Sequence, residues 1–423
     1  MKNKMRILIT GGAGFVGSRL ALAFAENARV TAFDNLRRRG SELNLRDLRQ
    51  AGVEFVHGDI RMPDDLAVLP SGFDLMIEAS AEPSVAAGQT GSPAYVIAAN
   101  LVGTANCLEF ARKKAGRFLF LSSSRVYSIA SLREIRLDET PDRFEIAPDQ
   151  STGAPSAQNE AIIGEIAKPP DARAGSPQNL EMAGDAPAIH SFACASIDAG
   201  LPGVSPKGVR EDFPTARARS FYGTTKLASE MLIQEYAESY GLEALINRCG
   251  VIAGPGQFGK TDQGVFTMWV ACHHFGIPLK YTGFGGTGKQ VRDLLHPDDL
   301  VGLVKKQIGG GRWRCEIFNV GGGRERSVSM REMTGVCREI VGREVPVGKV
   351  EETAPWDVPV YLTDHGKVSA AYGWSPGKSI NDIVSETASW IRNHERILEP
   401  LFIHSRVSAS ANALKKGSLC QKR

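Results

Sequence analysis

The chain has 423 residues, enough for a sizeable hydrophobic core and two or three domains. Its 50 Lys and Arg residues nearly balance 47 Asp and Glu residues, and this net charge of +3 excludes a broad attractive field for nucleic acid or an anionic membrane. The seven cysteines form no Cys-x-x-Cys pair, and no apolar run is expected to span a bilayer, so we predict a cytoplasmic protein without disulfides, structural zinc, nucleic-acid partner or membrane partner.

Strands and helices alternate through the N-terminal part of the chain. This pattern predicts an α/β fold with a Rossmann-type, doubly wound parallel sheet. Strands are predicted at Arg6–Thr10, Arg29–Asp34, Val53–His57, Leu75–Ile77 and Phe118–Leu121, and helices at about Phe15–Glu26 and Asn100–Lys114.

A Pro-rich segment, residues 141–215, interrupts the alternation. It holds ten of the 22 prolines and shows no sustained hydrophobic period. We predict a partly disordered insertion that is sensitive to proteases between about Pro148 and Pro202. A helix follows at about Tyr222–Tyr240, then a less regular region to about residue 400 and a flexible tail over 401–423.

Gly11, Gly14 and Gly17 follow the first strand and open the first helix. In this setting the first glycine permits a tight turn, the second admits a pyrophosphate close to the backbone, and the third lets helix and strand pack closely. Unpaired N–H groups at the helix N-terminus then face the phosphates. The motif predicts a dinucleotide site, and the alternative is a helix-capping glycine cluster without a ligand.

Asp34 ends the second strand, 20 residues beyond Gly14. A carboxylate there accepts hydrogen bonds from the adenosine ribose and repels a 2′-phosphate, which favours NAD over NADP. Arg37, Arg38 and Arg39 favour the opposite choice if they bind a 2′-phosphate, although a solvated charge run is the commoner role for such residues. We predict NAD as the cofactor.

Tyr222 and Lys226 stand four residues apart and share one face of the predicted helix. A nearby ammonium lowers the phenol pKa, which is otherwise near ~10. Tyr222 can then take a proton from an alcohol while a nicotinamide takes the hydride, and both steps can run in reverse. The pair therefore predicts hydride chemistry on an alcohol or ketone.

The glycine turn and the Tyr-x-x-x-Lys pair together resemble the extended branch of the short-chain dehydrogenase/reductase superfamily. The resemblance implies a catalytic Ser123, four residues before Tyr127, with Ser122 or Ser124 as the alternative if the turn is offset. It places Lys226 on the nicotinamide ribose and Asp59 beside the adenine. The implied cofactor-binding residues are Gly11, Gly14, Phe15, Val16, Gly17, Asp34, Asn35, Asp59, Ile60, Ala79, Ala81, Tyr222 and Lys226.

The resemblance also separates reaction types within this branch. Nucleotide-sugar dehydratases carry an Asp-Glu pair directly after the catalytic threonine, whereas this chain has Ser124 and Arg125, so dehydration is not expected. Enzymes acting on UDP- or dTDP-sugars usually have an asparagine where this chain has Val251. Residues 261–264 and 288–296 instead resemble the CDP-paratose and CDP-tyvelose 2-epimerases.

The implied substrate contacts lie after the catalytic helix, apart from one on the serine run. Arg292 is a candidate for the nucleotide diphosphate, since a planar guanidinium can bond two oxygens, and a structural salt bridge with Asp293 or Asp298 is the alternative. The substrate-binding candidates are Ser124, Gln257, Gln263 and Arg292. No residue is predicted to bind a metal.

These inferences divide the chain into an NAD-binding domain (1–140 and 216–252), the insertion (141–215), a substrate-binding α/β region (253–400) and the tail (401–423). The predicted function is an NAD-dependent nucleotide-sugar epimerase that inverts C2 of a CDP-3,6-dideoxyhexose and forms a homodimer or higher homo-oligomer. The alternatives are a UDP- or dTDP-sugar 4-epimerase, a nucleotide-sugar dehydrogenase or reductase, and a non-catalytic NAD-binding sensor or scaffold.

Overall fold

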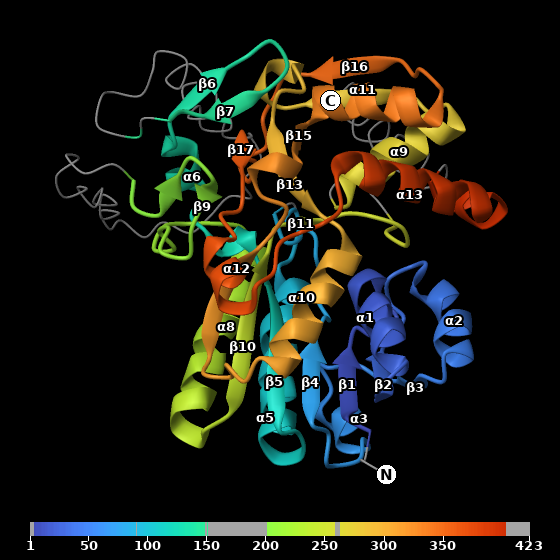
Figure 1. Cartoon of the computed structure of the whole chain (residues 1–423), viewed down its shortest axis with the longest axis vertical. Coiled ribbons are helices and arrows are strands. Elements are labelled where there is room, and N and C mark those ends of the chain that lie inside the picture. The colour runs from blue at the N-terminus through green and yellow to red at the C-terminus, as the bar shows by residue number, and fades with distance from the viewer. Residues whose placement is uncertain (1–3, 90, 149, 151–200, 259–262, 403–423) are drawn as a thin grey trace, which may run out of the picture.

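The computed structural model describes residues 4–89, 91–148, 150, 201–258 and 263–402 (Figure 1). Most of the segment predicted to be protease-sensitive, residues 151–200, and the tail from residue 403 lie outside the described residues.

A sheet of seven parallel strands organises the N-terminal half, in the order β14-β10-β5-β4-β1-β2-β3. The chain leaves β1 toward β2 and β3 and later returns on the other side of β1 with β4, so the crevice for a ligand lies above β1 and β4. This arrangement confirms the predicted Rossmann-type sheet. The strands are β1 (Arg6–Thr10), β2 (Arg29–Asp34), β3 (Glu54–His57), β4 (Leu75–Glu78), β5 (Arg117–Ser123), β10 (Glu243–Cys249) and β14 (Glu316–Val320).

Helices cover both faces of this sheet, because successive residues of a buried strand point to opposite faces. On β1, Ile7 and Ile9 belong to one buried cluster and Leu8 to the other. The first cluster lies under α1 (Phe15–Ala25), α2 (Leu45–Gln50), α10 (Pro297–Gly309) and α12 (Gly366–Tyr372), with η1 (Ser41–Asn44) before α2. The second lies under α3 (Pro63–Ala67), α5 (Gly103–Lys114) and α8 (Phe221–Tyr240).

One helical stretch departs from the prediction that no apolar run spans a bilayer. Residues Ala94–Lys114, comprising α4 (Ala94–Ile97), η2 (Ala98–Val102) and α5, are long and apolar enough by length and composition. Half of the most apolar window is buried inside the protein. The buried residues Cys107, Leu108 and Ala111 belong to the core under the sheet.

The second half of the chain forms a smaller α/β unit above the carboxyl ends of the strands (Figure 1). Its sheet contains β11 (Val251–Ile252), β13 (Val291–Leu295), β15 (Ser327–Ser329) and β17 (Val360–Tyr361). Three helices pack around a separate apolar cluster, namely α9 (Val265–Phe275), α11 (Met330–Val341) and α13 (Ile380–Asn393). A further pair joins β12 (Leu279–Thr282) to β16 (Val347–Val350), with turns η4 (Phe284–Gly286) and η5 (Arg324–Arg326) nearby. Residues 253–400 also contain two elements of the Rossmann domain. β14 is a strand of its sheet, and α10 packs against that sheet.

The described flanks of the Pro-rich segment are packed. Strands β6 (Leu137–Glu139) and β7 (Phe144–Ile146) pair, as do β8 (Val204–Ser205) and β9 (Gly208–Val209). Helix α6 (Ile129–Glu134) precedes them. Phe144, Val209 and Phe213 are buried in one cluster with Tyr127 and Tyr361, so both flanks bury apolar side chains near the substrate-side sheet.

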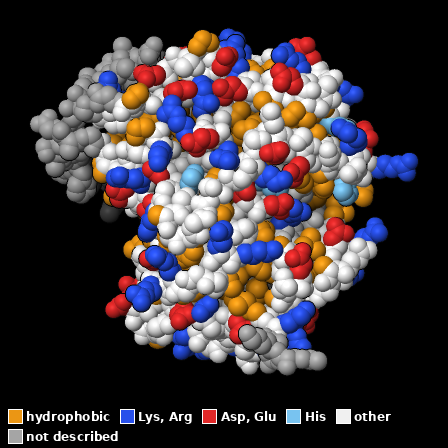
Figure 2. Space-filling view, viewed as in Figure 1, with side chains coloured by type: hydrophobic (Ala, Val, Ile, Leu, Met, Phe, Trp, Pro, Cys, Tyr) orange, Lys and Arg blue, Asp and Glu red, His pale blue; other side chains and the backbone are white. Residues whose placement is uncertain are grey.

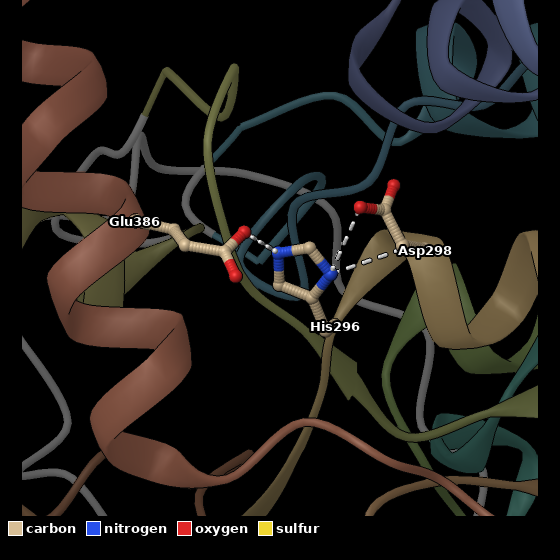
Figure 3. A group of neighbouring side chains, drawn as sticks. All are labelled: His296, Asp298 and Glu386. Carbon is tan, nitrogen blue, oxygen red and sulfur yellow. Dashed lines mark hydrogen bonds and ion pairs between the residues drawn. The ribbon is translucent and has the colours of Figure 1, made fainter.

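Charged clusters join the two units. His296 at the start of α10 accepts the Asp298 N–H at 3.1 Å, and its Nε2 lies 3.3 Å from Glu386 on α13 (Figure 3). Arg19 pairs with Asp298 at 2.5 Å and Lys378 pairs with Glu386 at 2.6 Å. Each carboxylate thus has a protein cation, and burial lowers the pKa of His296. Over the face in Figure 2, cationic and anionic side chains are likewise interspersed.

Candidate active site

A cleft of about 580 Å³ opens at the carboxyl ends of β1, β2 and β4. Its lining comes from the β1–α1 turn, the residues after β2, the residues after β3 and the residues after β4. Nearly all the predicted cofactor residues line it: Gly11, Gly14, Phe15, Val16, Gly17, Asp34, Asn35, Asp59, Ile60, Ala79 and Ala81. The catalytic candidates do not line this cleft, and two of the substrate candidates, Gln257 and Gln263, do.

The glycine turn has the shape that a bound pyrophosphate requires. Gly11 has φ of +67°, and a Cβ there would lie 2.7 Å from the Ser80 backbone. A Cβ on Gly17 would lie 2.1 Å from the Gly11 carbonyl oxygen. Phe15, Val16 and Gly17 in the first turn of α1 line the cleft, and a helix N-terminus in this position suits a dinucleotide phosphate.

Asp34 lines this cleft, and its carboxylate accepts hydrogen bonds from Leu36 N at 2.8 Å and Ala13 N at 3.1 Å. Burial raises the pKa of Asp34, and the backbone hydrogen bonds oppose that rise. Asn35 donates to Asp59 at 2.9 Å, which ties the ends of β2 and β3 together. Pairing with Arg61 outweighs desolvation and lowers the pKa of Asp59 to about 2, so this carboxylate is ionised.

Arg37, Arg38 and Arg39 also line the cleft. The Arg37 guanidinium lies 4.0 Å from the centre of the Tyr95 ring, which makes a cation–π contact. Arg38 donates to the Phe258 carbonyl at 3.1 Å and to Gln263. Tyr95 is a cleft residue that sequence reasoning missed, because no motif surrounds it.

Ser123 at the end of β5 lies beside Tyr222 at the start of α8 and acts to lower the pKa of the Tyr222 phenol. Ser220 caps α8 by accepting the Gly223 N–H at 3.1 Å, so the helix begins at Phe221 and Tyr222 lies in its first turn. A Cβ on Gly223 would lie 2.0 Å from the Arg125 carbonyl oxygen. This close approach brings the start of α8 against the end of β5. Burial raises the pKa of Tyr222, and Ser123 and Arg125 oppose the rise.

Lys226 is buried below Tyr222. Its Nζ donates to the Leu121 carbonyl at 2.9 Å and lies 4.3 Å from the centre of the Phe120 ring. Burial lowers the pKa of Lys226, and the nearby Glu78 carboxyl raises it.

Glu78 is a second residue that sequence reasoning missed. The signal was available, since a glutamate at the end of a wholly buried strand is unusual.

A buried ion pair holds the rest of α8 against the sheet. Arg248 on β10 pairs with Glu230 at 2.7 Å, and Ser122 donates to the same carboxylate at 2.5 Å. Arg248 also donates to Tyr127, which donates to Asn319 at 2.6 Å. The network crosses β5, β10 and β14, so it fixes the position of the catalytic helix.

The four substrate candidates are dispersed. Ser124 is buried beside Ser123, and Gln257 is tied to the Ile252 carbonyl and Thr267. Gln263 accepts a hydrogen bond from Arg38. Arg292 pairs with Asp357 at 2.6 Å and donates to the Val358 carbonyl at 2.7 Å. The salt bridge considered for Arg292 is therefore present, but Asp293 and Asp298 were the wrong partners.

A dinucleotide-shaped cleft at the switch point of the sheet, beside a Ser–Tyr–Lys group, defines a Rossmann protein of the short-chain dehydrogenase/reductase kind. A sequence profile of the NAD dependent epimerase/dehydratase family matches residues 7–148 and 181–321. The chain belongs to this family. The predicted cofactor, NAD, and the predicted superfamily are thereby confirmed.

Individual relatives include both epimerases and dehydratases. CDP-paratose 2-epimerase from Salmonella typhi is 27% identical over 404 residues, covering 91% of this chain and 99% of the relative. dTDP-glucose 4,6-dehydratase from an Actinoplanes species is 25% identical over 402 residues, covering 92% and 98%. The crystal structure of UDP-glucuronic acid 4-epimerase from Bacillus cereus with UDP-glucuronic acid and NAD superposes with a TM-score of 0.66 at 21% identity, covering 92% of this chain and 99% of that one. The chain is thus an NAD-dependent member of a nucleotide-sugar epimerase and dehydratase family.

Proposed function

We propose that the protein is an epimerase that inverts C2 of a CDP-3,6-dideoxyhexose of the paratose or tyvelose type. The observation that carries the proposal is the end of β5, where Ser123 lies beside Tyr222 and the next two residues are Ser124 and Arg125. A hydroxyl pair for proton transfer is present, and the adjacent acid pair of a dehydratase is not. The similarity to the CDP-paratose 2-epimerase supports the choice of sugar.

The proposed mechanism follows from an acidity argument. A C2 proton without a neighbouring carbonyl is not acidic, so the carbon must be oxidised to a ketone before it can be inverted. Tyr222 takes the hydroxyl proton in the oxidation and returns it in the reduction, while Ser123 orients the sugar oxygen. Lys226 supplies the positive charge that favours the phenolate. The glycine turn and Asp34 would hold NAD, which when bound would supply hydride acceptance and return at that carbon.

The test is a product assay by NMR on a panel of CDP-, UDP- and dTDP-sugars. Inversion at C2 of the CDP-dideoxyhexose supports the proposal. Inversion at C4 of a UDP- or dTDP-sugar, or net accumulation of a keto sugar, identifies one of the other enzymes instead. No reaction with any sugar despite bound NAD favours the sensor or scaffold.

We expect the protein to bind NAD more tightly than NADP, because Asp34 repels a 2′-phosphate. Asp34→Asn removes the charge but keeps an acceptor for a backbone N–H. It should lower the ratio of NAD affinity to NADP affinity by about tenfold, or ~1.4 kcal/mol. Titration of both dinucleotides measures this change. Asp47→Ala, on the exposed side of α2, is the control and should leave the ratio unchanged. Tighter NADP binding by the unaltered protein would mean that Arg37–Arg39 outweigh Asp34.

We also propose a dimer contact and a cellular location for the enzyme. The exposed surfaces of α5 and α8 are the proposed dimer contact, as in the related superfamily. Met231 and Tyr240 on α8 are exposed there, as is Val102, the last residue of η2 directly before α5. We further propose that the enzyme acts on its nucleotide-sugar substrate in the cytoplasm.

A further inference from the structure

A buried carboxyl group lies in the sheet next to the catalytic lysine. Glu78 is the last residue of β4 and is fully buried. Its Oε1 accepts a hydrogen bond from Thr104 on α5 at 2.6 Å, and its Oε2 has no hydrogen-bond partner among the described residues. A buried carboxyl with one oxygen unpaired is costly, and a native site that keeps one calls for an explanation.

The strand register brings Glu78 and Lys226 together. Glu78 stands opposite Phe120 on β5, and the Lys226 ammonium lies 4.3 Å from the Phe120 ring. Lys226 donates one hydrogen bond, to the Leu121 carbonyl, and has no salt bridge within 4 Å in the described part of the chain. The Glu78 carboxyl is the largest influence that favours its charged form.

The other titratable groups around this pair have less influence on the charge of Lys226. Cys107 on α5 faces Glu78, and Cys249 on β10 faces Lys226. Burial raises the pKa of both thiols, so they are neutral. Glu230 on α8 also acts on Lys226, but its carboxylate is already paired with Arg248.

We propose that Glu78 is a positioning residue of the active site, whose carboxylate serves as the counter-ion that keeps Lys226 protonated. The inference rests on the proposed catalytic role of Tyr222 and Lys226. A lysine buried without a counter-ion tends to lose its proton, and a neutral lysine no longer favours the Tyr222 phenolate. Glu78 thus acts on the reaction through Lys226 and does not touch the substrate.

The free energy of unfolding should depend on pH in a way that reports the ionisation of this buried group. Burial raises the pKa of Glu78 to about 7, with Lys226 and Thr104 opposing the rise. Because the pKa of Glu78 is higher in the folded than in the unfolded protein, its contribution to stability is fully present below pH 4.5, the ordinary pKa of a glutamate. The contribution is lost as the pH rises through about 7. Glu78→Gln removes the titrating group, so between pH 4.5 and about 7 the unfolding temperature should depend less on pH than it does in the unaltered protein.

The deciding experiment measures the ionisation of Tyr222 without any substrate. The phenolate absorbance of the NAD-loaded protein is titrated against that of its Tyr222→Phe variant, and the difference reports Tyr222 alone. In the Glu78→Gln background we expect Tyr222 to ionise about one pH unit higher or more, because Lys226 is then neutral. Glu78→Asp keeps the charge and should recover most of the shift.

The matched control is Glu54→Gln on β3, where the glutamate also accepts a threonine hydrogen bond, at 3.0 Å from Thr31. It should leave the Tyr222 titration unchanged. Glu78→Met supplies a second neutral variant in case Glu78→Gln does not fold, since apolar replacement of a buried charge often preserves folding. An unchanged Tyr222 titration in a folded neutral variant overturns the proposal. Because no sugar is involved, that result is separate from any failure of the proposed reaction.

Discussion

Replacing Tyr222 with phenylalanine is expected to lower turnover by at least ~10²-fold, the usual contribution of a positioned general acid–base group. The ring remains, so the start of α8 keeps its packing. The phenol oxygen beside Ser123 is lost, and with it the group that we propose exchanges a proton with the sugar hydroxyl. Steady-state rates and NAD titration measure the two quantities separately, and NAD binding should be unchanged.

The control for this substitution lies on the same helix. Tyr240 is 61% exposed at the C-terminal end of α8, and Tyr240→Phe should retain full activity. A Tyr222→Phe variant with wild-type turnover would remove the catalytic assignment. Loss of folding in that variant would instead show that the phenol has a structural role.

Gly17→Ala is expected to have the second large effect, on cofactor binding. The new Cβ would lie 2.1 Å from the Gly11 carbonyl oxygen and 2.8 Å from its carbonyl carbon, so backbone atoms must move. Overpacking of this kind costs about 1–3 kcal/mol, and here the displaced segment is the turn that cradles the pyrophosphate. We expect NAD affinity to fall by ~10-fold or more, measured by titration.

Gly335→Ala is the matched control, because Gly335 lies in α11 and a Cβ there meets nothing within 4 Å. Alanine in an open helix position should stabilise the protein slightly, by about 0.5–1 kcal/mol. If Gly17→Ala binds NAD as tightly as the unaltered protein, the turn does not hold the pyrophosphate in the proposed way.

The Rossmann half was predictable because buried parallel strands have short apolar runs with clear ends. Arg6–Thr10 and Arg29–Asp34 match β1 and β2 residue for residue. The return of β14 to this sheet was not predictable, because strand order depends on tertiary packing and leaves no local pattern. The sequence analysis did not anticipate that Ala94–Lys114 has the length and composition of a membrane span, because a half-buried core helix and a membrane helix share that composition.

The site shows the same division between local and tertiary signals. The glycine turn and the Tyr222–Lys226 spacing are local, and the sequence was sufficient to propose them. Arg292 illustrates the limit, because its partner, Asp357, is 65 residues away and no spacing rule connects the two. Glu78 is an exception, because a glutamate at the end of a wholly buried strand is itself a local signal.

The central claim is that C2 is inverted by oxidation and return of the same hydrogen. The most direct measurement uses a CDP-3,6-dideoxyhexose deuterated at C2, incubated in ordinary water without added NAD. The account predicts an inverted product that keeps its deuterium at C2, with no accumulation of NADH. Loss of the label to solvent would contradict it, since that outcome requires proton abstraction, and so would transfer of the label to free cofactor. Inversion at C4 would still be consistent with oxidation and hydride return at a sugar carbon. It would contradict the assignment of the substrate and of C2 as the inverted carbon.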